Sequence, residues 1–210
     1  MEKSTIRKKY IEFVLEEGKK PASVFSFAKK LKMNESDFYG FYSSFEAIEK
    51  DFWSSIFTET LEQLEADTTY QGYSAREKLL AFYYLWIQKL RDNRSYVVSF
   101  KDQNIKSIPM NINGFDDFRQ KFLKYAENII SEGVDKNEIK FRKYITDKYT
   151  HGFWLQTMFV LNYWVGDSSE NFEMTDAAIE KAVNLSFKLI SDNVIDNVID
   201  FGKFIFQKAV

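Results

Sequence analysis

The stretch SDFYGFYSSFEAIEKDFW, residues 36–53, carries seven aromatic residues where a short helix turns into a long one. Asn34 can cap the short helix, with Asp37 three residues on as in a capping box, and Ser44 can cap the long one. The aromatic rings Phe38, Phe41, Tyr42, Phe45 and Phe52 are expected mainly to pack helices together. The alternative is that part of this stretch is the reading face of a DNA-binding module.

Around this stretch, helical periodicity predicts an all-α chain. We expect a helix ending at Gly18, one opened by Ser23, the two above, and later helices over 74–92, 96–105, 115–132 with a stop at Gly133, 141–165, 175–191 with Thr175 as its cap, and 194–208. We divide this into a three-helix N-terminal module at 1–50 and a larger helical body at 51–210. The first 50 residues hold ten Lys or Arg against eight Asp or Glu, a local charge of +2 in a chain of net charge −2.

Composition excludes several classes of protein. The 210 residues are 45% hydrophobic and contain no cysteine, so disulfides and thiolate metal sites are ruled out. The apolar run 152–166 is too short to cross a bilayer, and the N-terminus lacks a signal-peptide pattern, so we expect a soluble cytoplasmic protein without a membrane partner.

Catalytic and metal-binding signatures are also missing. His151 is the only histidine, so a transition-metal site is not expected. A stripe of three acidic residues is more typical of a solvated helix face than of a cation site: Asp192, Asp196 and Asp200. No nucleophile elbow, phosphate loop or zinc motif occurs, so an enzyme, a metal and a cofactor are not expected.

From Ser23 to Ile48 the chain resembles the TetR family of bacterial transcriptional regulators. The matching positions are Ser23, Phe27-Ala28, the turn Lys32-Met33-Asn34, Phe38-Tyr39 and Phe41-Tyr42-Ser43-Ser44-Phe45-Glu46-Ala47-Ile48. The resemblance implies a helix-turn-helix head, a body that binds a small effector, and a homodimer on a palindromic double-stranded operator. It assigns DNA contacts to Lys3, Arg7, Ser23, Asn34, Glu35, Ser36, Asp37 and Tyr39.

Several positions depart from the family pattern. Lys32 replaces the usual turn glycine, Glu35 replaces a basic residue, Ser36-Asp37 replaces Gly-Thr, and Phe45 replaces the lysine that opens the fourth helix. We therefore expect DNA binding that is weaker and less sensitive to salt than this frame normally gives. The alternative is a carrier of an apolar or lipid-like ligand, with the same fold, that has lost DNA binding.

In the body, four aromatic residues are candidates to line a ligand cavity, although core packing alone explains any single one of them: Tyr83, Trp86, Phe153 and Phe159. The helix over 141–165 and the helix from Thr175 are expected to pack against a second copy in a C2 four-helix interface. The candidates for its buried seam are Trp154, Leu161 and Leu185. The apolar segment 194–208 is expected to dock on the body.

Overall fold

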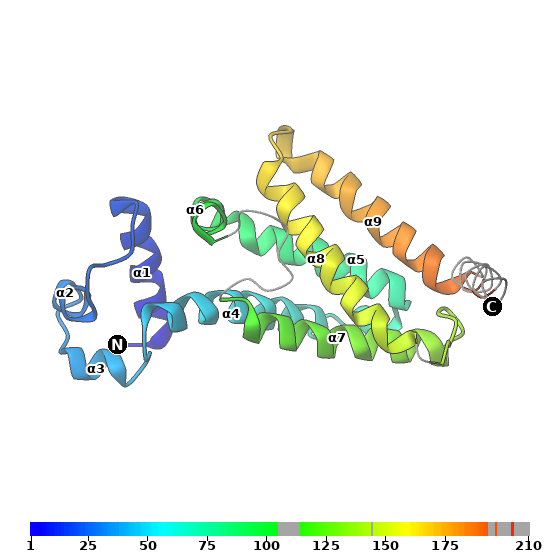
Figure 1. Ribbon diagram of the computed structural model, residues 1–210, viewed down its shortest axis with the longest axis horizontal. Helices are drawn as coiled ribbons and strands as arrows, with labels where there is room; N and C mark the ends of the chain where they lie inside the picture. Colours follow the sequence, from blue (N-terminus) through cyan, green and yellow to red (C-terminus); the bar gives the residue numbers. More distant parts are fainter. Residues whose placement is uncertain (105–113, 144, 193–195, 197–202, 204–210) are drawn as a thin grey trace. The chain divides into compact units, whose positions relative to one another are not determined.

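A computed structural model describes residues 1–104, 114–143, 145–192, 196 and 203 (Figure 1). All regular structure in these ranges is helical, which confirms the predicted all-α class. None of the described helices has the length and apolar character needed to cross a bilayer. The chain packs as two compact units, 1–62 with 86–121 and 63–85 with 122–210. The predicted boundary at residue 50 separates a DNA-binding module from a ligand-binding body. These packing units do not test that functional division, so it stays a prediction.

The first unit begins with four helices, α1 (Lys3–Glu17), α2 (Val24–Lys30), α3 (Glu35–Tyr39) and most of α4 (Phe45–Glu65). Their ends follow the predicted signals. Gly18 ends α1 with a positive φ of 66°, and the hydroxyls of Ser23 and Ser44 accept hydrogen bonds from the backbone N–H groups of Ser26 and Ala47. The unit is completed by the end of α5 (Ala75–Arg91), by α6 (Arg94–Asn104) and by the start of α7 (Asp116–Asp135).

Aromatic rings hold α1 to α4 together, as expected from the sequence. Phe27 of α2 makes edge-to-face contacts with rings from the other three helices: Tyr10 and Phe13 of α1, Phe38 of α3 and Phe45 of α4. Phe38, Tyr42 and Phe52 are also buried. Phe41 is the exception, with 37% of its surface exposed, so the packing expectation was wrong for that residue.

Two carboxylates of α4, those of Asp51 and Glu49, form polar contacts with α1 and with the segments between the first four helices. Asp51 accepts hydrogen bonds from Lys3 Nζ at 2.8 Å, Arg7 Nη1 at 2.6 Å and the Tyr42 hydroxyl at 2.8 Å. The buried Glu49 accepts from the Tyr10 hydroxyl at 2.8 Å and from Lys20 Nζ at 3.0 Å. The contacts of Lys3, Arg7 and Tyr10 therefore hold α1 on α4, although Lys3 also remains exposed to solvent.

The second unit contains most of α5 and α7 together with α8 (Tyr149–Gly166) and α9 (Glu173–Ser191), which run antiparallel and side by side (Figure 1). Phe82 of α5 packs on Phe122 and Tyr125 of α7. Short 3-10 turns, Tyr70–Gly72, Thr146–Lys148 and Glu170–Phe172, join the longer helices.

The helix predicted over 141–165 begins only at Tyr149, and Phe141 is exposed. Before α8, the buried guanidinium of Arg142 donates to the Ile190 carbonyl oxygen, the Tyr149 hydroxyl and the Asp196 carboxylate. These hydrogen bonds hold Arg142 against the end of α9. Asp196 also accepts from Lys140, so it is ion-paired and not part of a solvated stripe. Asp200, and almost all of the helix expected over 194–208, lie outside the described residues.

Two predicted helix ends were also wrong. α9 begins at Glu173, and Thr175 lies inside its first turn, where its N–H and hydroxyl both donate to the Asp167 carboxylate at 2.9 and 2.6 Å. Gly133 does not end α7, which continues to Asp135. There the chain folds back so closely that Ile139 lies directly over Gly133.

Replacing Asp51 by Asn should lower the free energy of unfolding by about 1–3 kcal/mol at pH 7, since Arg7 and Lys3 lose a charged acceptor. Burial raises the pKa of Asp51, but the hydrogen bonds from Lys3, Tyr42 and Arg7 outweigh it, so this pKa lies below its ordinary value. A lowered pKa contributes stability above the unfolded pKa of about 3.9 and loses it as the pH falls through the folded value. The difference from the parent should therefore shrink below about pH 4. Denaturant titrations at pH 7 and pH 3 measure it, with Glu62→Gln on α4 as the control; equal differences at both pH values would contradict this assignment.

Replacing Gly133 by Ala should destabilise the protein, although alanine is the better helix former. The new Cβ would lie 2.6 Å from Ile139 Cδ1 and 3.0 Å from the Ala75 Cβ, and such overpacking costs about 1–3 kcal/mol. Gly152 of α8 is the matched control, because its Cβ would meet no described atom within 4 Å. Gly152→Ala should gain up to about 1 kcal/mol. Thermal melts of the two variants measure the contrast, and a gain for both would show that the Gly133 site is not tight.

Candidate nucleic-acid interface

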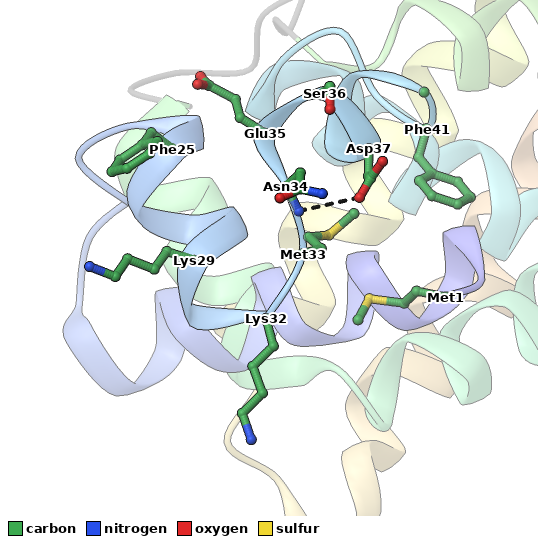
Figure 2. A pocket seen from close by; sticks show the side chains of 11 residues that line it. Met1, Phe25, Lys29, Lys32, Met33, Asn34, Glu35, Ser36, Asp37 and Phe41 are labelled. Atoms are coloured by element: carbon green, nitrogen blue, oxygen red, sulfur yellow. Dashed lines mark hydrogen bonds between the residues drawn. The ribbon is translucent and has the colours of Figure 1, made fainter.

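The helices α2 and α3 and the turn between them surround a surface hollow of about 910 Å³ (Figure 2). Lys32, at the position where the resembling family has glycine, adopts a left-handed backbone with φ 57°. That conformation favours glycine, so the family preference has a direct structural reason here. The hollow is lined by Met1, Phe25, Lys29, Lys32, Met33, Asn34, Glu35, Ser36, Asp37, Gly40 and Phe41.

Four of the predicted DNA-contacting residues line this hollow: Asn34, Glu35, Ser36 and Asp37. Asp37 also has a structural contact, because its carboxylate accepts a hydrogen bond from the Asn34 N–H at 3.3 Å. Tyr39 is exposed at the end of α3 and rests edge-on against Phe38. Ser23 is exposed and caps α2, while its N–H donates to the Ser26 hydroxyl.

Lys3 and Arg7 lie elsewhere in the first unit. Both are ion-paired with Asp51, and Arg7 also lies 3.7 Å from Glu59. Neither side chain lines the hollow between α2 and α3. A phosphate would have to compete with Asp51 for these cations, so a large share of their charge is already neutralised.

Sequence reasoning missed three side chains of this face: Phe25, Lys29 and the side chain of Lys32. Phe25 is 61% exposed, and neither lysine forms an ion pair with a residue that the structure describes. Phe25 and Lys29 are four residues apart on α2, whereas Lys32 follows the end of that helix in the turn. The spacing of Phe25 and Lys29 is visible in the sequence, but the expectation for α2 was based on its apolar side.

Phe45, at the position where the family has a lysine, packs between helices as expected from the sequence. The ring stacks on Tyr10 with centroids 5.4 Å apart and meets Phe27 and Phe38 at 5.7 and 6.0 Å. A lysine at position 45 would place an ammonium group among three rings, so the substitution Phe45→Lys would disturb the packing of these helices.

The predicted ligand-pocket residues have different surroundings within the two units. Tyr83 and Phe153 meet in the core of the second unit, where the Tyr83 hydroxyl contacts the Thr157 hydroxyl at 3.1 Å and the Phe153 carbonyl oxygen at 3.3 Å. Trp86 belongs to the first unit and stacks on Phe118. Phe159 is exposed on α8, 5.9 Å from the Tyr163 ring.

Phe159 lies in an apolar groove of about 590 Å³ between α8 and α9. Its large exposed apolar residues are Leu155, Phe159, Met174, Leu185 and Leu189, beside the small residues Ala177, Ala178 and Ala182. Of the predicted seam residues, only Leu185 is available, with 59% exposure. Trp154 and Leu161 are only 2% and 4% exposed within their own chain, so they were wrongly placed on an outer surface.

Comparisons with known proteins agree with this architecture. A family model described as "Tetracyclin repressor-like, C-terminal domain" matches residues 78–205, which is more than half of the chain. No curated protein matches in sequence. Among solved structures, a protein described as a TetR-family transcriptional regulator from Syntrophomonas wolfei aligns with a TM-score of 0.66 and 15% identity over 89% of this chain and 93% of that one.

Two further structures have the same fold. A transcriptional regulator from Cytophaga hutchinsonii gives a TM-score of 0.54 at 18% identity, covering 90% of this chain and 98% of its own. The TetR-family regulator PfmR from Thermus thermophilus gives 0.52 at 14% identity, covering 85% and 97%. Both cover the head and the body. With the family match over 78–205, the chain belongs to the TetR family of transcriptional regulators.

Proposed function

We propose that this protein is a dimeric transcriptional regulator that binds double-stranded operator DNA through the α2–α3 face. The observation that carries the proposal is the combination on that face of an exposed recognition helix and two lysines without an ion pair among the described residues. Phosphate contacts by such cations position a protein on the duplex, while side chains at the start of a recognition helix reach the bases.

The proposed mode of binding has a limited electrostatic component. Lys29 and Lys32 are offset by the carboxylates of Glu35 and Asp37 on the same face, and Lys3 and Arg7 are paired with Asp51. Each phosphate neutralised by a cation releases counterions, so few free cations mean a shallow dependence of affinity on salt. Base contacts must then supply a larger share of the discrimination.

A homodimer would form through the α8–α9 groove. Contiguous exposed apolar residues mark interaction surfaces, and alanines between them allow two helices of another copy to approach closely. Two copies related by a twofold axis would present two heads to the two halves of a palindromic operator, as the family resemblance implies.

An apolar effector in the body would regulate DNA binding by linkage. Tyr83 and Phe153 are the predicted wall residues that meet, and their surroundings suit an uncharged ligand, because burial raises the pKa of Tyr83 and its hydroxyl proton is already donated to the Phe153 carbonyl oxygen. A ligand that binds more tightly to the conformation with the wrong head spacing lowers operator affinity by that difference.

Replacing Lys29 and Lys32 by Ala should weaken DNA binding and reduce the slope of log K against log salt by about 1.8, or 0.9 per lost phosphate contact. Fluorescence anisotropy with a duplex from the gene's own upstream region, titrated at several salt concentrations, measures both. The control variant, Lys124→Ala with Lys148→Ala, removes two exposed lysines of the second unit and should leave the slope unchanged. Failure of the parent to bind DNA even at low salt would overturn the proposal in favour of a ligand carrier.

Replacing Leu185 by Glu should raise the dimer dissociation constant by about a hundredfold or more, because a twofold interface brings the two new carboxylates close to each other. Sedimentation velocity over a concentration series measures it. Phe141→Glu is the control, since Phe141 is 66% exposed but does not line the groove. If the parent sediments as a monomer at micromolar concentration, or if the two variants dimerise equally well, the groove is not the interface.

A further inference from the structure

The two acidic residues at the start of α3 have different surroundings. The carboxylate of Asp37 turns back toward the turn and accepts the Asn34 N–H, whereas the side chain of Glu35 extends away from α3 (Figure 2). Glu35 is exposed, and it forms neither a hydrogen bond nor an ion pair with the residues that the structure describes. Of the two carboxylates, Glu35 is therefore the one that is available to a ligand on this face.

An exposed aromatic ring lines the same hollow. Phe25 of α2 has 61% of its surface in contact with solvent, more than Tyr39 or Phe41. Phe27 packs against Phe13, Phe38 and Phe45 of the other three helices, and the core of α1 to α4 is formed without the Phe25 ring. This ring offers apolar surface where the neighbouring side chains offer charge.

The chemistry of the major groove limits what these two groups can recognise. A carboxylate only accepts hydrogen bonds, so it is repelled by the N7 and O6 acceptors of guanine and by O4 of thymine. Adenine presents its amino group next to the N7 acceptor, whereas cytosine presents its N4 amino group as a donor. The only apolar group that a base exposes in this groove is the C5 methyl of thymine, which a phenylalanine ring can contact.

We propose that Glu35 selects a cytosine and Phe25 a thymine in each operator half-site, so that the face reads pyrimidines through one amino group and one methyl group. This inference rests on the proposed DNA binding. It also accounts for the departure from the family pattern at residue 35, because an acidic residue that weakens phosphate attraction gains a role in base discrimination.

Selection of bound sites from a random double-stranded pool tests Glu35. The parent should enrich a site with cytosine at one fixed position of each half. Glu35→Gln should change the preference at that position to adenine, which glutamine binds through N6 and N7, and should reduce discrimination for cytosine by about tenfold or more. Glu62→Gln removes the same charge from an exposed position on α4 and should enrich the parental site.

Substitution of uracil for thymine in the enriched duplex tests Phe25, because it removes only the methyl group. Parental affinity should fall by about threefold to tenfold at one position per half-site, while Phe25→Ala, already weaker, should not distinguish the two duplexes. Phe141→Ala, which removes an exposed ring from the other unit, should show the full parental effect of uracil.

The outcomes separate this inference from the function on which it rests. If the parent enriches a site and binds it tightly, but Glu35→Gln enriches the same bases and uracil has no effect, the base assignments are wrong and DNA binding stands. If neither the parent nor Glu62→Gln enriches any sequence or retains DNA at low salt, the proposed DNA binding fails and the base assignments fail with it.

Discussion

The packing of α1 to α4, which form the head of this protein, depends on the contacts of one ring, that of Phe27. It meets Tyr10 and Phe13 of α1, Phe38 of α3 and Phe45 of α4 with centroids 5.7–6.2 Å apart. Because edge-to-face pairs have a preferred geometry, one side chain of α2 fixes that helix against three others. A short α2 of seven residues and an α3 of five have little stability of their own, so their orientation comes from this packing.

The same packing determines which charges remain for function. Phe45 completes the aromatic cluster in place of a lysine. Asp51 pairs with Lys3 and Arg7 of α1, and Glu49 pairs with Lys20 of the segment after α1. Stability of the head and attraction to phosphate thus compete for the same side chains. The α2–α3 face keeps two lysines and two carboxylates, of which one carboxylate caps α3. Such a face is better suited to distinguish bases than to bind any duplex strongly.

Local signals predicted the head well, because caps and turns act over a few residues. Ser23, Ser44 and Gly18 have the roles that their positions indicate, and Asp37 bonds to the Asn34 N–H. Contacts between residues farther apart could not be predicted from local sequence. Arg142, in the segment before α8, binds Ile190, which is 48 residues away, and Asp167 accepts a hydrogen bond from Thr175 in α9. Helix α8 is apolar all round, so hydrophobicity could not tell the buried Trp154 and Leu161 from the exposed Leu155 and Phe159.

Weak electrostatic attraction to DNA would give the proposed dimer a particular importance. When two heads are joined, binding of the first places the second at an effective local concentration in the millimolar range, which can raise overall affinity by about 10² to 10⁴ without a new contact. A head in which Lys3 and Arg7 are already paired with Asp51 would gain most from this effect. Occupancy of an operator would then depend on the α8–α9 surface as much as on the face that contacts bases. An effector that changes the spacing of the heads would cancel the bivalent gain while leaving each head intact, so a modest change in the body suffices to release the DNA.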